Sequence, residues 1–404
     1  MRGSSTFCCL AASASVLASA TAGNANSLAQ IALQKVLQDS SEVFGDYTAA
    51  AGFNSTSDGG RLANWMSALP DSRSLSHINI PGTHDAATWN YTQEKQDSLV
   101  NATKCDGTTA APAPVYRCQR ESIVQALDKG IRFFDLRFAA DPLGQRIVFW
   151  HSAALVSARA GVGDVLFGVW DWLSRHGSET VLLSFQHESG TTANSSFDAE
   201  VQRMMREALT GEVAERFVWQ GRGYVPTLGE TRGKVVLVKR FDMDGDDDDA
   251  ASGPGKLPGL HMSLNKWLDN SQTPFALVYN ETTNATAYIE DYYEPDVLGE
   301  NSTVVSNIDA KLVAVKANLQ KAAAADKDSL FITFASAEHD SNTPPVVPET
   351  MALGNGTEVT PNGGVNHQLV DVLKSLMGKR LGVVVLDFFD EPENLVDLVL
   401  GGEV

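Results

Sequence analysis

The sequence predicts one α/β domain with a (β/α) barrel architecture of the TIM type. From residue 76 onward, short apolar runs rich in β-branched residues alternate with stretches of helical period. Such alternation implies a parallel sheet whose strands are buried on both faces. About eight such strands before residue 404 favour a closed barrel over an open sheet. The chain shows no internal repeat and no second core.

The expected elements follow from these runs. Strands are expected at 76–81, 131–138, 146–151, 180–188, 234–241, 275–281, 329–337 and 382–390. Helices are expected at 119–129, 164–176, 197–209, 304–325 and 366–379.

The first 74 residues are expected to lie outside the barrel. Arg2, the short apolar stretch 7–19 and the small residues at 20–22 have the pattern of a secretory signal peptide. We therefore expect a signal peptide over 1–22, an N-terminal extension over 23–74 and the barrel domain over 75–404. A propeptide and a plug for the barrel bottom are both open interpretations of the extension.

Cysteines and glycosylation sequons agree with export to the extracellular space. Cys8 and Cys9 leave with the signal peptide, and the remaining pair, Cys105 and Cys118, is expected to form a disulfide. Eight Asn-x-Ser/Thr sequons indicate a secreted glycoprotein. They stand at Asn54, Asn90, Asn101, Asn194, Asn280, Asn284, Asn301 and Asn355.

The formal net charge of −19 argues against a nucleic-acid partner, because such a surface repels polyanions. Anionic bilayers offer it no general electrostatic attraction either. Any contact with a membrane surface is therefore expected to be transient and to use local apolar groups.

Polar residues gather where the predicted strands end. In a (β/α) barrel the carboxyl ends of the strands meet at one mouth, where such folds carry out chemistry. Buried polar groups at those positions are costly unless they share a site. The residues concerned are His84 and Asp85 after the first strand, Arg137, His151, Glu188 and Arg240 at later strand ends, and Asp387 in the last.

These residue types suit acid–base chemistry on a phosphodiester. Two imidazoles can serve as base and acid because their pKa lies near neutral pH. Asp85 and Asp387 are available to orient them, and Arg137 could bind a phosphoryl group. Structural hydrogen bonds for both histidines are the competing interpretation.

The motifs that carry these residues resemble the X domain of phosphatidylinositol-specific phospholipases C, above all the single-domain bacterial enzymes and their secreted fungal relatives. The resemblance rests on IPGTHDAATW, GIRFFDLRF, IVFWHSAAL and ETVLLSFQHES, and spans about residues 76 to 188. It continues more loosely to the end of the chain.

The resemblance implies a distorted TIM-type barrel and a two-step reaction. The inositol 2-hydroxyl attacks the neighbouring phosphodiester, which releases diacylglycerol and a cyclic inositol phosphate. By position, His84 resembles the general base with Asp387 as its partner, and His151 resembles the general acid supported by Asp85. Arg137 stands where animal relatives use Ca²⁺, so no metal and no other cofactor is expected.

Substrate contacts are implied by the same resemblance. Arg240 and Asp291 match positions that bind inositol hydroxyls, and Tyr293 matches an aromatic residue on which the ring stacks. Glu188 is expected to orient its neighbours. Gln186 departs from the bacterial pattern, which has Lys there, so the headgroup preference is open.

The leading hypothesis is a secreted, monomeric phospholipase C acting on phosphatidylinositol or on glycosyl-phosphatidylinositol (GPI) anchors. A glycerophosphodiesterase or phospholipase D-like enzyme on the same barrel is an alternative, although it needs a carboxylate metal cage. A non-catalytic secreted binding protein is the third class.

Overall fold

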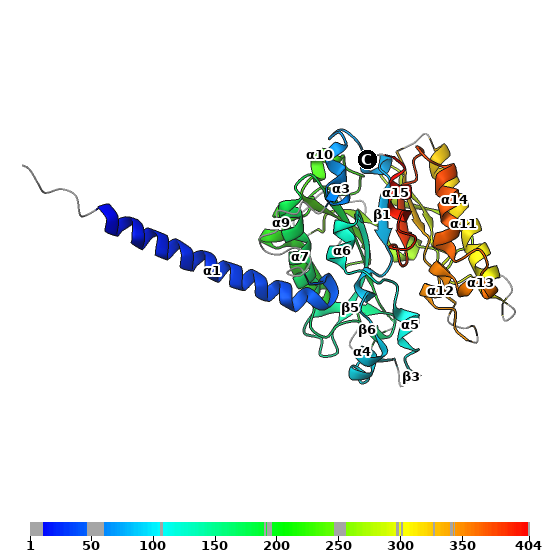
Figure 1. Cartoon of the computed structure of the whole chain (residues 1–404), viewed down its shortest axis with the longest axis horizontal. Helices are drawn as coiled ribbons and strands as arrows, with labels where there is room; N and C mark the ends of the chain where they lie inside the picture. Colours follow the sequence, from blue (N-terminus) through cyan, green and yellow to red (C-terminus); the bar gives the residue numbers. More distant parts are fainter. Residues whose placement is uncertain are drawn as a thin grey trace, which may run out of the picture.

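A computed structural model describes residues 11–46, 60–105, 108–189, 191, 196–245, 256–295, 299, 302–325, 328–339, 342 and 344–402. Their central feature is a barrel-like sheet wrapped by helices, from which one long helix projects (Figure 1). None of the helices in these ranges is long and apolar enough to cross a membrane.

Eight parallel strands form the wall of the barrel. Each pairs in parallel with its neighbour through the sheet order β11-β12-β13-β1-β4-β7-β8-β9. They are β1 (Ile80–Thr83), β4 (Phe133–Ala140), β7 (Thr180–His187), β8 (Lys234–Arg240), β9 (Leu260–His261), β11 (Ala285–Glu290), β12 (Leu330–Phe334) and β13 (Val383–Leu386). The central strands are almost wholly buried, as a sheet covered on both faces requires.

The barrel is distorted, because one of its two terminal strands is antiparallel to its neighbour. β10 (Phe275–Asn280) runs antiparallel to β11, and the described strands show no pairing between β9 and β10. Our expectation of a parallel strand at 275–281 was therefore wrong in direction. Only four residues join β10 to β11, too few for the crossover that parallel strands need.

The expected third barrel strand, 146–151, lies outside the barrel wall. It forms β5 (Ile147–His151), which pairs antiparallel with β4 and with β6 (Ala154–Leu155). The turn before it is closed by Asp141, whose carboxylate accepts the backbone N–H groups of Gln145 and Arg146. This short connection dictates a hairpin, and the hairpin carries His151 beside the end of β4. A small ribbon, β2 (Lys104–Cys105) with β3 (Thr108–Thr109), completes the strands.

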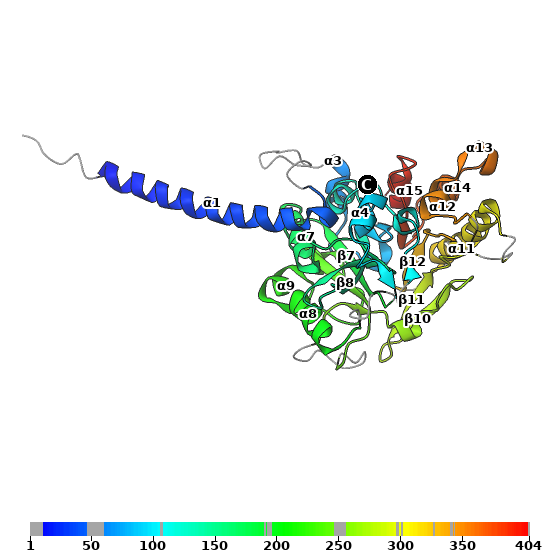
Figure 2. The ribbon, with the colours of Figure 1, turned by 90° about the horizontal axis from the view of Figure 1, so that it is seen from below.

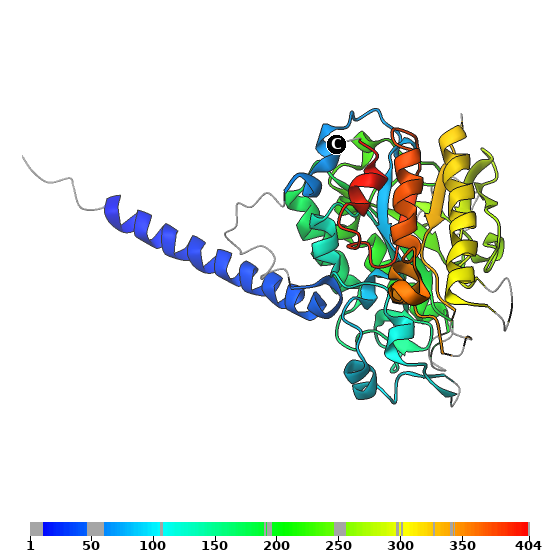
Figure 3. The same cartoon turned by 45° about the vertical axis from the view of Figure 1, so that its right-hand side comes forward.

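Helices cover the barrel on two sides. Figure 2 shows α7, α8 and α9 on one side and α11, α12 and α14 on the other, and Figure 3 shows α11 and α14 side by side. The principal helices are α6 (Ile123–Asp128), α7 (Val162–Arg175), α8 (Ala199–Thr210), α9 (Glu212–Phe217), α11 (Val304–Ala324) and α14 (Val365–Ser375). Side-chain caps fix several of their starts, such as the capping box of Ser122 and Gln125 at α6.

Shorter helices fill the connections between these elements. They are α3 (Gly60–Ala63), α4 (Gln93–Ser98), α5 (Ala113–Tyr116), α10 (Leu228–Thr231), α12 (Pro348–Leu353), α13 (Gly356–Val359) and α15 (Leu395–Leu400). Single 3-10 turns are η1 (Trp65–Ala68), η2 (Leu75–His77), η3 (Ala86–Thr88) and η4 (Leu264–Lys266).

The region before β1 contributes to the core. Helix α1 (Ala11–Phe44) projects from the molecule, but its last turn packs on α7, where the Phe44 ring lies against Gly168. Trp65 and Met66 are buried at the amino ends of β4 and β7. There Arg132 donates to the carbonyls of Leu62 and Ala63. The segment 60–69 thus plugs the barrel bottom.

Candidate active site

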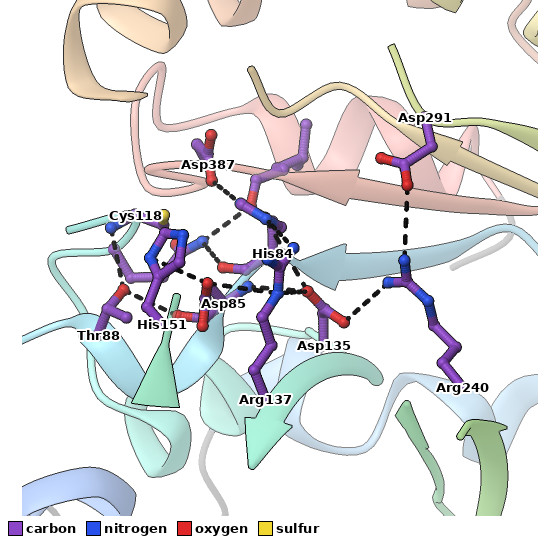
Figure 4. A network of polar contacts seen from close by, with 12 residues as sticks. His84, Asp85, Thr88, Cys118, Asp135, Arg137, His151, Arg240, Asp291 and Asp387 are labelled. Carbon is purple, nitrogen blue, oxygen red and sulfur yellow. Dashed lines mark hydrogen bonds and ion pairs between the residues drawn. The ribbon is translucent and has the colours of Figure 1, made fainter. Parts of the chain in front are cut away.

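Strand register places His84 beside Asp387. Thr83 of β1 is paired with Leu386 of β13, so the residues that follow them emerge side by side. The His84 Nδ1 atom lies 2.8 Å from Asp387 Oδ1, and both side chains are almost fully buried (Figure 4). A carboxylate only accepts hydrogen bonds, so Nδ1 carries the proton and the lone pair of the neutral ring is on Nε2.

Arg137 links this pair to three carboxylates. Its Nη2 atom lies 2.8 Å from His84 Nε2. Its Nε atom lies 3.3 Å from Asp135 and 3.4 Å from Asp85, and Nη1 lies 3.3 Å from Glu188. Three carboxylates thus fix the position of the guanidinium, and its Nη2 atom contacts His84.

His151 reaches the same cluster from the β5–β6 hairpin. Its Nδ1 atom hydrogen-bonds the carbonyl of Tyr116 at 2.8 Å and lies 3.1 Å from Asp85 Oδ2. The rings of His84 and His151 are 6.2 Å apart and nearly perpendicular. The five residues proposed for catalysis are therefore together, although they come from four separate stretches of the chain.

Left-handed backbone conformations flank the clustered side chains. Asp85, Ser152 and Phe388 have φ values of 43°, 49° and 45°. Asp85 belongs to the cluster itself, Ser152 directly follows His151, and Phe388 directly follows Asp387. Such conformations cost about 1–2 kcal/mol for residues with a Cβ and concentrate at functional sites. The turns after β1, β5 and β13 thus hold their side chains at some cost in stability.

Burial and nearby charge shift the pKa of each titrating group. Burial lowers the pKa of His84, but the charge and hydrogen bond of Asp387 outweigh it, so the pKa is raised above 6.5. Burial, helped by the charges of Arg137 and His84, lowers the pKa of His151 to about 4. Burial raises the pKa of Asp85 to about 7 against the attraction of Arg137.

Comparison with known proteins connects this geometry to one family. Residues 110–241 match the family model described as "Phosphatidylinositol-specific phospholipase C, X domain". That segment contains Arg137, His151, Gln186, Glu188 and Arg240. Residues 110–241 of this chain are thus similar to a PI-PLC X domain.

The related proteins include bacterial 1-phosphatidylinositol phosphodiesterases. That of Listeria monocytogenes is 30% identical over 43% of this chain and 47% of its own length. That of Staphylococcus aureus is 27% identical over 80% of this chain and 88% of its own length. The chain thus spans about half of the first relative and most of the second. A human PI-PLC X domain-containing protein 1 is 28% identical over 44% of the chain.

Solved structures show the same fold over most of the chain. A phosphatidylinositol-specific phospholipase C of S. aureus superposes with a TM-score of 0.60 at 21% identity, over 84% of this chain and 97% of its own. The L. monocytogenes enzyme gives 0.57 at 18% identity, over 84% and 97%. The predicted distorted TIM-type barrel is confirmed.

The residues predicted to bind the headgroup begin with Arg240, which connects to the His84 and Arg137 cluster through Asp135. Arg240 Nη2 is 3.5 Å from Asp291, and its Nη1 is 3.3 Å from Asp135. Tyr293 is half-buried and its hydroxyl donates to Asp269. Gln186 is paired with both Arg137 and Arg240 in the strand register, so the departure from Lys falls between the two guanidinium groups.

Two site residues were missed by the sequence reasoning. Asp135 is fully buried and touches Arg137 and Arg240, and it precedes Arg137 by two positions on the same face of β4. That spacing in FFDLRF was the available signal. Trp267 is the second, since its ring lies 3.8 Å from the Arg240 guanidinium and its Nε1 donates to Asp291. No local motif marked it.

The predicted disulfide between Cys105 and Cys118 was wrong. Cys118 is a free, fully buried thiol packed among the catalytic residues. Its backbone N–H donates to Thr88 Oγ1, and its carbonyl accepts from Phe388 N. The side chain of Cys105 lies outside the described part of the chain. The sequence spacing gave no sign that position 118 belongs to the site.

Proposed function

We propose that this chain is a phospholipase C that cleaves phosphatidylinositol by intramolecular attack of the inositol 2-hydroxyl. The observation that carries the proposal is the arrangement of two imidazoles 6.2 Å apart with a guanidinium 2.8 Å from one of them. The homology to 1-phosphatidylinositol phosphodiesterases supports the substrate class.

His84 has the tautomer that a general base needs. Its proton on Nδ1 points to Asp387, so the Nε2 lone pair is free to accept the proton of the 2-hydroxyl once substrate displaces Arg137 Nη2. The negative charge of Asp387 then stabilises the imidazolium that forms. This assigns the buried pair to the first step of the reaction.

Arg137 and His151 act on the other side of the phosphorus. The guanidinium neutralises charge that develops on the phosphoryl oxygens. His151 donates a proton to the glycerol oxygen as the P–O bond breaks, so diacylglycerol and inositol 1,2-cyclic phosphate are formed. The substrate phosphate favours the cationic form of His151, whose pKa is lowered in the free site by burial and by the positive charges of Arg137 and His84.

We also propose that catalysis needs no metal ion, because Arg137 provides the positive charge at the phosphoryl group. The test is phosphatidylinositol cleavage in detergent with and without EDTA. Unchanged activity agrees with the proposal, and a loss that Ca²⁺ restores contradicts it.

Product analysis tests the reaction itself. With phosphatidylinositol in mixed micelles, ³¹P NMR should detect inositol 1,2-cyclic phosphate, the product of intramolecular attack. His84→Ala or His151→Ala should reduce turnover by roughly 10²–10⁴-fold. His77→Ala is the control, since this exposed histidine lies outside the site and should leave turnover unchanged. Near-full activity in either site variant would refute the assignment. GPI-anchored protein in the same assay tests the second substrate.

Export, N-glycosylation and a monomeric state belong to the same proposal. Three sequon asparagines that the structure describes, Asn101, Asn284 and Asn355, are exposed, and so are accessible to an oligosaccharide. N-glycosidase treatment of protein from a eukaryotic secretory host should increase its gel mobility, and light scattering should give the mass of one chain.

A further inference from the structure

Cys118 lies between the two histidine–aspartate pairs but has no part in the proposed reaction. Its backbone is fixed from both sides, because its N–H binds the turn after β1 and its carbonyl binds the turn after β13. Within the described residues, its thiol has a long contact of 3.9 Å to the Tyr116 carbonyl and a hydrogen bond with the Thr88 side chain. The sulfur atom is thus held in a fixed place beside carboxylate oxygens and imidazole nitrogens, which are also common metal ligands.

One trio of ligand types around this thiol fits a thiophilic divalent cation. Atoms of His84, Cys118 and Asp387 all lie within 4.8 Å of one another. Tetrahedral Zn²⁺ needs ligand atoms about 3.3–3.8 Å apart, so movements of about 1 Å would complete three corners. In addition, Asp387 is 1% exposed and its Oδ2 atom has no hydrogen-bond partner within the described residues. That orphaned oxygen is a second indication of a ligand.

A second group, Asp85, Cys118 and His151, shares the same thiol and is the weaker candidate for a metal site. Asp85 is an ion-pair partner of Arg137 at 3.4 Å, and the guanidinium opposes a cation there; Arg137 approaches the other trio at His84 Nε2, not at the Nδ1 atom that faces Asp387. Asp387, by contrast, forms its ion pair within the described residues with His84, which is itself a possible metal ligand. We propose that His84, Cys118 and Asp387 form an inhibitory site for thiophilic divalent cations such as Zn²⁺ and Cd²⁺.

Occupation of this site would disable the general base by a change of tautomer. The ion binds the Nδ1 lone pair, so the single proton of the neutral ring must reside on Nε2. The lone pair that would accept the 2-hydroxyl proton is then lost. The Cys118 thiol gives its proton to solvent on binding, so inhibition weakens as pH falls. Burial of the thiol beneath the imidazoles makes its onset slow.

Cd²⁺ binding tests the site directly. Cadmium–thiolate bonds absorb in the near ultraviolet, and equilibrium dialysis gives the stoichiometry, so neither readout requires activity. The full chain should bind one Cd²⁺ that Cys118→Ser does not bind. Cys105→Ser is the matched control and should behave as wild type. His84→Ala should lose the Cd²⁺ signal, whereas His151→Ala should keep it.

Inhibition of phosphatidylinositol cleavage is the second readout, and it alone rests on the proposed function. Cys118→Ser, which should retain basal turnover, should raise the half-inhibitory Cd²⁺ concentration by roughly 10- to 100-fold. EDTA should reverse the inhibition, and Mg²⁺ should not cause it. Cys118→Ala serves in the same way if the serine variant does not fold. Wild type that binds no Cd²⁺, or binding and inhibition that persist without Cys118, would overturn the proposal. An inactive wild type that still binds Cd²⁺ through Cys118 would refute the proposed function and leave this site standing.

Discussion

Replacement of Asp387 by Asn separates the charge of this side chain from its shape. The variant keeps the size of the side chain and should fold, although loss of the charged hydrogen bond should lower the free energy of unfolding by about 1.5–3 kcal/mol. It removes the negative charge 2.8 Å from His84 Nδ1 in a pair whose side chains are 11% and 1% exposed. The pKa of His84 should fall, because Asp387 is the group that raises it.

The expected loss of activity follows from that contact. A hydrogen bond to a charged group contributes about 1.5–3 kcal/mol, which corresponds to roughly 10- to 150-fold in rate at 1.36 kcal/mol per factor of ten. An Asn amide can also donate to Nδ1 and so select the wrong tautomer, which extends the loss to roughly 10⁴-fold in a comparable triad. We therefore expect kcat/KM to fall about 100-fold or more.

The assay is cleavage of phosphatidylinositol in mixed micelles across pH, with ¹H–¹⁵N spectra of the histidine rings to follow the tautomer. Asp390→Asn is the matched control, because Asp390 lies three residues further along and contacts neither imidazole within the described part of the chain. An Asp387→Asn variant within about threefold of wild type would refute the pairing on which the proposed base depends.

Three further predictions follow from other contacts. The proposed reaction needs neutral His84 and cationic His151. Since the pKa of His84 is raised above 6.5 and that of His151 is lowered to about 4, kcat/KM should be flat between these two pKa values and should fall on both sides. A kcat/KM that keeps rising into the alkaline range would contradict this. Trp267→Ala removes the ring over Arg240 and the donor to Asp291, so KM should rise several-fold in micelle assays with a smaller change in kcat. Glu179→Gln leaves Arg132 buried without its charged partner and should lower the free energy of unfolding by about 3–5 kcal/mol in urea titrations, without change in the turnover of folded enzyme.

Much of the site was predictable because its residues stand at the ends of parallel strands. His84, Arg137 and Asp387 follow or end buried runs, and strand register alone brings such positions together. His151 was assigned to the right site for partly the wrong reason, since it lies on a hairpin that folds back along β4. The six residues before β5 are too few for a crossover, a signal present in the sequence but not used.

Other features depend on contacts that no local pattern encodes. β11 (ATAYIE) lacks the dense apolar run by which the other strands were recognised, so its pairing with β12 was missed. Trp267 meets Arg240 from a loop, and Cys118 reaches the site from the segment before α6. For a lone pair of cysteines in an exported protein, composition favoured a disulfide, whereas tertiary packing placed one of them in the core.

The hydrogen bond from His84 to Asp387 joins residues 303 positions apart. His84 is therefore synthesised long before Asp387. The two side chains meet only after β1 and β13 have paired. A nascent chain still emerging from the ribosome has no working base. The proposed base therefore forms only after β13 has paired with β1, so the proposed cleavage of lipid requires nearly the whole barrel to be folded.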